Sequence, residues 1–306
     1  MKKICFLVRF LVIGVCFLSC VEEIPVKDLG IKSKLVLHCY ISPQYDSISV
    51  SLSRSQPAYF SGTTSSKVEY AMVEMSNDNK NWVQIPYSKE NNCYLLPQYQ
   101  FPIEEGKTYY IRASAPDYET VTACCTVPFW RECTLVPEVE FINSKDYRYP
   151  FVRLFLSWED YRGEENQYAF IGSYPYVTEE GDTITMIYVA NDEDNKIVFS
   201  DIGKDGQKMK NPVGYIDSCT YPMFMEYTEY YRYILFMQTD KNCCSYENSV
   251  RPYLYGRRMG DFEDAFLVEP SLVYNNVKNG YGVFGALVFK SYIVDFRKKT
   301  VKEENF

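Results

Sequence analysis

Cys20 is the residue whose neighbours predict chemistry most directly. Lys2 and Lys3 open the chain, an apolar run with one arginine follows from residue 4 to 18, and Ser19 precedes the cysteine. This order is typical of a bacterial lipoprotein signal peptide. The run of about fifteen residues is shorter than the roughly twenty that span a bilayer as a helix. We therefore expect cleavage before Cys20 and attachment of acyl chains such as palmitate to it, with an ordinary cleaved signal peptide as the alternative.

The chain offers little for nucleophilic or metal-assisted catalysis. His38 is the only histidine, and it lies in a stretch with strand character, where a histidine is usually structural. A Ser-His-Asp or Cys-His site needs a histidine beside its nucleophile, and zinc sites draw on clustered His and Cys. We therefore predict no catalytic residue, no metal ligand and no cofactor, and we do not expect an enzyme. The 40 acidic residues leave a pair of glycosidase-like carboxylates as a minor alternative.

The acidic run from Asn191 to Asn195 offers oxygen ligands of the kind that calcium takes. It lacks the glycine and the distal glutamate of an EF-hand loop. We interpret it as a solvated hairpin tip and predict no metal site there.

Of the 11 cysteines, two leave with the signal peptide and Cys20 takes lipid. The rest lie in an exported body, where disulfides can form. Neighbouring residues of a strand point to opposite faces, so each adjacent pair of cysteines is expected to have one buried and one outward thiol. Buried free thiols are the alternative. The disulfide candidates, whose pairing stays open, are Cys39, Cys93, Cys124, Cys125, Cys133, Cys219, Cys243 and Cys244.

The charge balance argues against nucleic acid as a partner. The formal net charge is −8 and becomes more negative without the basic signal peptide, whereas nucleic-acid binding needs clustered Lys and Arg. With 46% hydrophobic residues the chain can bury a core, and its 306 residues suggest two domains. The 29 tyrosines favour β structure and also suit glycan or protein surfaces.

Short apolar runs separated by turns must form the framework. Ile48, Val50 and Leu52 alternate with serines, which is typical of a strand with one buried face. Similar runs on both sides predict an N-terminal β-sandwich. The expected order is a signal peptide at 1–19, a lipidated tether at 20–34 and the sandwich domain at 35–128.

A second β-rich domain is expected at 129–306. It begins with an alternating run that ends at Trp158, and a long insertion is expected at about 176–217. One segment departs from the β pattern, because Tyr231, Ile234, Leu235 and Gln238 recur at helical spacing. We predict a helix at about 228–239.

The order of several short sequences resembles domain-of-unknown-function family 4249, outer-membrane lipoproteins of Bacteroidota. These sequences are distributed along nearly the whole mature chain: KLVL at 34–37, VEYAMV at 68–73, GKTYYI at 106–111, EYYRY at 229–233, EP at 269–270 and NVKNGYGVF at 276–284. The resemblance implies a mainly β fold, with an immunoglobulin-like or carboxypeptidase-regulatory-like sandwich followed by a second β-rich domain. It supplies no catalytic residues.

The resemblance also implies a role. Members are often encoded beside TonB-dependent outer-membrane receptors, so we expect an accessory or binding subunit in nutrient uptake. Glu22 and Glu23 resemble the export signal that places lipoproteins of Bacteroidota on the outer face of the outer membrane. We therefore expect a lipid-anchored protein exposed at the cell surface. The alternative is a free-standing glycan- or protein-binding adhesin, with the tyrosine-rich region at 221–233 as its stacking surface.

Two short motifs predict O-glycosylation. Asp46-Ser47-Ile48 and Asp182-Thr183-Ile184 resemble the Asp-Ser/Thr-apolar sites modified in exported proteins of Bacteroidota. Ser47 and Thr183 are therefore candidates, with chance occurrence as the alternative.

Overall fold

The computed structural model describes residues 32–56, 66–142, 151–177, 183–189, 198–216, 231–258 and 272–304. The predicted signal peptide with Cys20, most of the tether, Cys219 and the acidic run at 191–195 lie outside these residues. No helix within them is long and apolar enough to cross a membrane.

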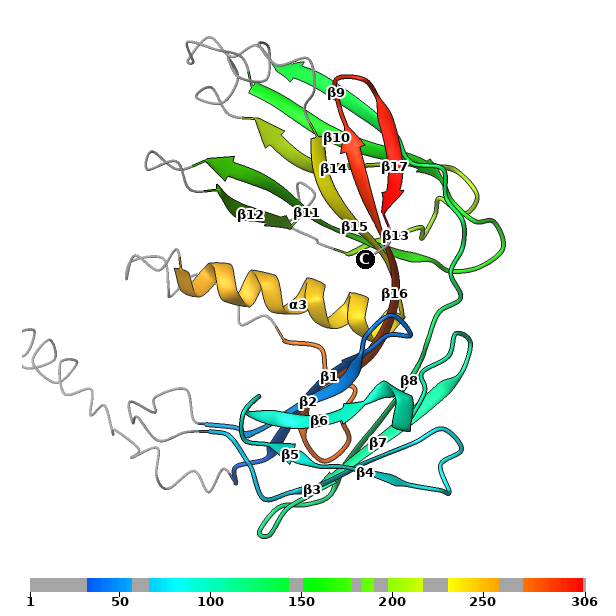
Figure 1. Ribbon diagram of the computed structural model, residues 1–306. Helices are drawn as coiled ribbons and strands as arrows, with labels where there is room; N and C mark the ends of the chain where they lie inside the picture. Colours follow the sequence, from blue (N-terminus) through cyan, green and yellow to red (C-terminus); the bar gives the residue numbers. More distant parts are fainter. Residues whose placement is uncertain are drawn as a thin grey trace, which may run out of the picture. The chain divides into compact units, whose positions relative to one another are not determined.

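The chain is mainly β, as predicted, and strands β1 to β8 with part of β16 enclose a first core (Figure 1). One layer is the sheet β4-β3-β7-β8, and the other is the β16-β1-β2-β6-β5 part of a ten-stranded sheet. This two-layer arrangement agrees with the predicted β-sandwich. The elements are β1 (Leu35–Ile41), β2 (Ser47–Arg54), β3 (Met72–Ser76), β4 (Val83–Ile85), β5 (Tyr87–Ser88), β6 (Cys93–Pro97), the 3-10 turn η2 (Gln98–Gln100), β7 (Thr108–Ser114) and β8 (Val121–Thr126).

The alternation predicted for the first strands is confirmed. In β2, Ile48, Val50 and Leu52 are buried and the residues between them face outward. In β1 the odd-numbered residues are buried in the first core, whereas His38 and Tyr40 lie on the opposite face and are half-buried. Strand residues alternate between faces, so β1 contributes to the sandwich on one side and leaves two aromatic side chains for a second layer on the other.

A second core lies between two further sheets. The three-stranded sheet β14-β10-β9 packs on the β11-β15-β16 part of the ten-stranded sheet. Aromatic side chains dominate this core, with Trp158, Tyr168, Phe170 and Phe236 all fully buried. The strands are β9 (Val136–Ile142), β10 (Phe151–Glu159), β11 (Gln167–Val177), β12 (Thr183–Val189), β13 (Val198–Ser200), β14 (Lys208–Ile216), β15 (Tyr231–Thr239), β16 (Tyr281–Asp295) and β17 (Thr300–Glu304).

Strand β16 belongs to both cores. Its first half pairs in parallel with β1 and buries Phe284 in the first core, and its second half pairs with β15 and buries Val294 in the second. Residues 34–306 form one compact unit. The predicted division at residue 129 did not include this sharing, because the strand that completes the N-terminal sandwich comes from the end of the chain.

Gly282 allows β16 to pair with β1. It has a φ of +115°, lies opposite Leu37, and would place a Cβ 1.9 Å from the Leu37 carbonyl oxygen. Neither the conformation nor the close approach suits a side chain.

The predicted helix at 228–239 is wrong. Residues Tyr231–Thr239 form strand β15, and the helix α3 (Lys241–Arg258) follows it directly. Strand β15 is central and buried on both faces, with Ile234 and Phe236 in the second core and Met237 against the α3 side. A strand buried on both faces is a near-continuous apolar run without period-two alternation, so it can match helical spacing by coincidence.

The predicted insertion at 176–217 contributes to the sheets. β12 forms one end of the ten-stranded sheet, β13 pairs with β11, and β14 pairs with β10 in the second core. The immunoglobulin-like character of the N-terminal part stays a prediction.

Candidate functional site

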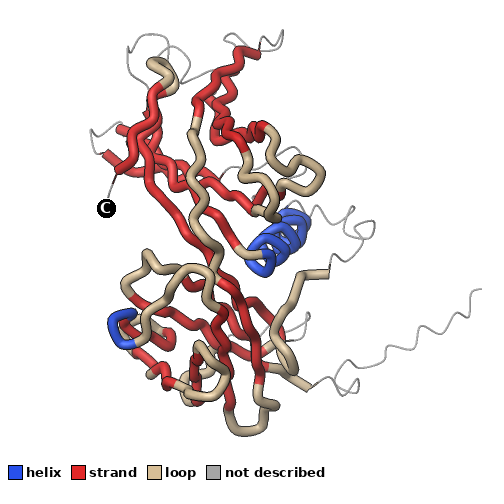
Figure 2. The backbone as a smooth tube through the Cα atoms, turned by 90° about the vertical axis from the view of Figure 1, so that its right-hand side faces the viewer, coloured by secondary structure: helices blue, strands red, loops and turns tan. Residues whose placement is uncertain are grey.

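A cavity of about 420 Å³ lies between α3 and the face of the ten-stranded sheet that turns away from the second core. Figure 2 shows α3 nearly end-on, beside the strands of this sheet. The walls are mostly apolar side chains, and a few polar groups reach in. The residues that matter for its chemistry are Tyr40, Met237, Thr239, Cys243, Glu247 and Arg251.

Local sequence explains how α3 reaches this position. Asp240 precedes the helix, and its carboxylate Oδ1 accepts the Cys243 backbone N–H at 2.8 Å, which satisfies a donor of the first turn. The Asp240 backbone N–H donates to the Ala286 carbonyl at 2.8 Å and so attaches the helix start to β16. Cys243, Glu247 and Arg251 then recur every four residues on one helix face, toward the cavity.

Polar contacts in the cavity centre on Glu247. The Tyr40 hydroxyl donates to Glu247 Oε1 at 2.6 Å, and burial is the main reason that the pKa of Tyr40 is raised. The Thr239 side chain is 5% exposed, and its hydroxyl lies beside the Cys243 thiol but within hydrogen-bond geometry of no described group. Arg251 lines the same cavity and makes no ion pair with any described residue. The cavity therefore presents an acid, a base and a hydroxyl within apolar walls.

Asp240 gives the helix start a pH dependence. Burial raises the pKa of this carboxyl from 3.8 to about 6, against the opposing effect of its hydrogen bonds. With the folded pKa above the unfolded value, the contribution of Asp240 to stability is complete below about pH 4 and is lost as pH rises through about 6. One pKa unit is about 1.4 kcal/mol, so the loss is on the order of 3 kcal/mol.

Asp240→Asn should remove that loss, because an asparagine oxygen still caps the helix but carries no charge. We expect the free energy of unfolding of the variant, relative to the wild type, to rise by about 3 kcal/mol between pH 4 and pH 7. Urea unfolding at several pH values measures this difference. A difference that stays constant across the range would contradict the assignment.

His38 lies beside the cavity and has a structural environment. Its ring packs edge-on against Tyr40 and Tyr246, at 5.2 and 5.0 Å between centroids. Burial lowers its pKa, and the opposing attraction of Glu247 is smaller. The imidazole is therefore held neutral between aromatic rings, and no described side chain hydrogen bonds to it.

The seven described cysteines are all free thiols. The adjacent residues Cys124 and Cys125 are exposed and buried respectively, as predicted for neighbours in a strand, here β8. Cys243 and Cys244 lie in α3 instead, buried and half-buried. Burial raises the pKa of the thiols of Cys39, Cys125 and Cys243, so these side chains act as small apolar groups. Pairing of the predicted cysteines stays a prediction, with Cys93, Cys133 and Cys244 half-buried.

The other predicted site residues are dispersed. Ser47 is half-buried at the start of β2, and Thr183 begins β12, with its side chain outside the described residues. Of the tyrosine-rich region at 221–233, only the end lies in the described part, where Tyr233 is 37% exposed. O-glycosylation and a tyrosine stacking surface stay predictions.

The sequence did not single out a group of three carboxylates in the second part of the chain. Atoms of Asp160, Asp201 and Asp205 lie within 4.8 Å of one another. Asp160 accepts hydrogen bonds from the Tyr168 hydroxyl at 2.6 Å and the Gly206 N–H at 2.8 Å. Burial raises the pKa of Asp201, the hydrogen bond from the Asn166 backbone N–H opposes this, and the charges of Asp160 and Asp205 add to the increase. The carboxylate oxygens could hold a cation. The hydrogen bonds that they accept also give them a structural role, because these bonds fix the turn at 201–207.

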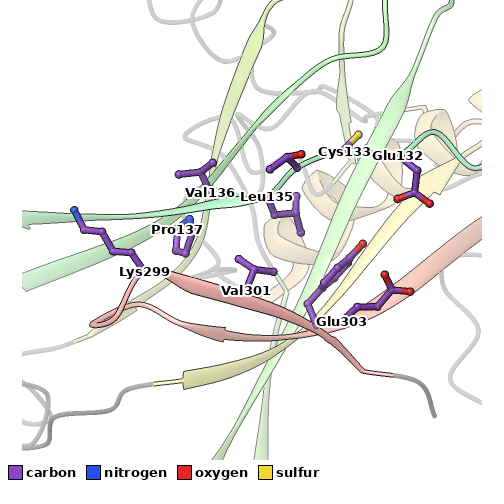
Figure 3. A pocket seen from close by; sticks show the side chains of 10 residues that line it. Glu132, Cys133, Leu135, Val136, Pro137, Lys299, Val301 and Glu303 are labelled. Carbon is purple, nitrogen blue, oxygen red and sulfur yellow. The ribbon is translucent and has the colours of Figure 1, made fainter.

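A groove of about 410 Å³ lies where β17 approaches the segment 132–137 (Figure 3). Charged side chains stand at its rim, and Lys290 pairs with both Glu132 and Glu303 at 2.8 and 3.3 Å. These three charges satisfy one another, and Lys299, which also lines the groove, makes no ion pair with a described residue. Fewer apolar side chains line this groove than the cavity beneath α3, so we take the cavity as the candidate site.

Comparison with known proteins gives a family. A search of curated proteins finds no match to the chain. A family model described as "Domain of unknown function (DUF4249)" matches residues 21–293, a range that includes the first core, most of the second core, α3 and the cavity beneath it. The chain therefore belongs to the DUF4249 family.

Proposed function

We propose that this protein is a lipid-anchored outer-membrane lipoprotein of the bacterial cell surface that serves as a non-catalytic binding subunit of a TonB-dependent receptor in nutrient uptake. The observation that carries the proposal is the cavity beneath α3, and the predicted lipidation sequence before the body supports the anchor. A cavity of this size with apolar walls and a few polar groups is a typical small-ligand site. Family membership supports an accessory role through the resemblance described above.

The anchor is the first part to test. We expect Cys20→Ser to abolish acylation, because it removes the residue that takes the lipid. Stable attachment to the membrane requires more than one acyl chain, so the variant should move from the membrane fraction to the soluble fraction. Metabolic labelling with palmitate and fractionation of the cells measure this. Ser19→Ala, which keeps a small residue before the cysteine, is the matched control and should remain acylated. Acylation of the Cys20→Ser variant would exclude this anchor.

The receptor is tested by mild extraction of the outer membrane from cells with a C-terminally tagged chain, followed by mass spectrometry. A TonB-dependent barrel recovered in near-stoichiometric amount is the expected result. Recovery of the lipoprotein alone would reject the accessory role and favour an independent adhesin, which a glycan array would then examine.

A further inference from the structure

Two opposite charges in the cavity beneath α3 stay apart. Glu247 and Arg251 are one helical turn apart, with the acid N-terminal to the base, the better order for an ion pair. Yet no N–O contact within 4.0 Å joins them, and Glu247 is held by the Tyr40 hydroxyl at 2.6 Å instead. Side chains of both signs therefore line one small space without neutralising each other.

Beside these charges the cavity has an apolar wall from the sheet. Ala169 and Val198 are 5% and 2% exposed, and Met237 and Leu287 are 9% and 5% exposed. Ile171 packs on the same cluster. The wall thus accepts aliphatic groups, while the α3 side offers one negative and one positive partner.

We propose that this cavity binds a small zwitterion with apolar side chains, namely an apolar amino acid or dipeptide. Its ammonium group lies at Glu247, its carboxylate at Arg251, and its side chains lie against Ala169, Ile171 and Met237. Charge-assisted hydrogen bonds to guanidinium and carboxylate groups are the strong ones, and the two partners lie on one rigid helix. The cavity of about 420 Å³ holds a ligand of that size.

This inference rests on the proposed binding role and supplies its ligand. It also explains why the charges remain separate, since a ligand with both charges can pair with each side chain at once. The Thr239 hydroxyl is buried beside the Cys243 thiol and has no geometric hydrogen bond to a described group, so it offers a further hydrogen bond to the bound molecule.

The test is calorimetric titration of the full lipoprotein in lipid nanodiscs with leucyl-leucine. Comparison ligands are N-acetyl-leucyl-leucine, which lacks the ammonium group, leucyl-leucine amide, which lacks the carboxylate, glycyl-glycine, which lacks side chains, and octanoate. We expect leucyl-leucine to bind at least tenfold more tightly than each of the others. Octanoate binding as tightly as the dipeptide would overturn the proposal in favour of a simple apolar-acid site.

Two substitutions assign the charges. Glu247→Gln keeps an acceptor for Tyr40 and should weaken leucyl-leucine binding at least tenfold while leaving the N-acetyl compound unaffected. Arg251→Met should weaken leucyl-leucine equally while leaving the amide unaffected. Lys241→Met removes an exposed cation from the same helix, outside the cavity, and should change no affinity. An unchanged melting temperature of each variant shows that folding is not the cause of weaker binding.

Failure of this inference is distinct from failure of the receptor role. Absence of dipeptide binding at millimolar concentration, or equal binding by wild type and both cavity variants, rejects the ligand whether or not a barrel co-purifies. Dipeptide binding without a barrel retains the ligand and rejects the receptor.

Discussion

Gly282→Ala is expected to destabilise the protein by more than 4 kcal/mol, or to prevent folding, because two separate penalties act at this position. A non-glycine residue in such a region of φ costs about 1–3 kcal/mol. In addition, the new Cβ would lie 1.9 Å from the Leu37 carbonyl oxygen, which is backbone and cannot move without opening the β1–β16 pairing. Urea unfolding followed by circular dichroism measures the loss.

Gly163→Ala is the matched control. Gly163 has a φ of +92°, yet a Cβ there would meet nothing within 4 Å. This variant should therefore show only the conformational penalty of about 1–3 kcal/mol. Equal losses at the two glycines would contradict the role given to the close approach of β16 to β1.

Phe236→Ala should cost about 3–5 kcal/mol through loss of buried area and formation of a cavity. The Phe236 ring stacks on Phe170 at 4.8 Å and on Tyr168 at 5.7 Å between centroids, and Trp158 packs beside it. It is fully buried at the centre of the second core. Thermal and chemical unfolding report the change.

Tyr99→Ala, at a side chain that is 82% exposed, removes a ring of similar size and should cost less than about 1 kcal/mol. A loss of similar size for both variants would show that Phe236 does not contribute as a packed core residue. Stabilities that coincide with the wild type would reject the aromatic core itself.

The N-terminal strands could be predicted because their information is local. In β2 every second residue is apolar and faces a core, so a period of two appears in the sequence. The central strand β15 has no such contrast, because Ile234 and Met237 are buried on opposite faces. Its burial depends on β11 and β16, which lie far away in the sequence, and this dependence made the helix prediction wrong.

Helix α3 carried weak sequence signals. Its sequence is polar and includes Pro252, a residue that disfavours helix interiors. The signals that could have found it are Asp240 as a cap and the four-residue spacing of Cys243, Glu247 and Arg251. The cavity itself could not be predicted, because it forms only where this helix meets side chains from five strands of the sheet, β1, β11, β13, β15 and β16.

The pairing of β1 with β16 sets the order in which the chain can fold. Strand β1 pairs with β2 directly, but Val36 also pairs with Tyr281, so β1 gains its second neighbour only after residues 37–280 have been made. The chain loses conformational entropy when this long loop closes, before the β1–β16 contacts can offset that loss, and this makes folding slow. A chain cut short before residue 281 would lack the strand that the two cores share, and both cores would stay incomplete. The synthesis of β16 is therefore the step after which both cores can close.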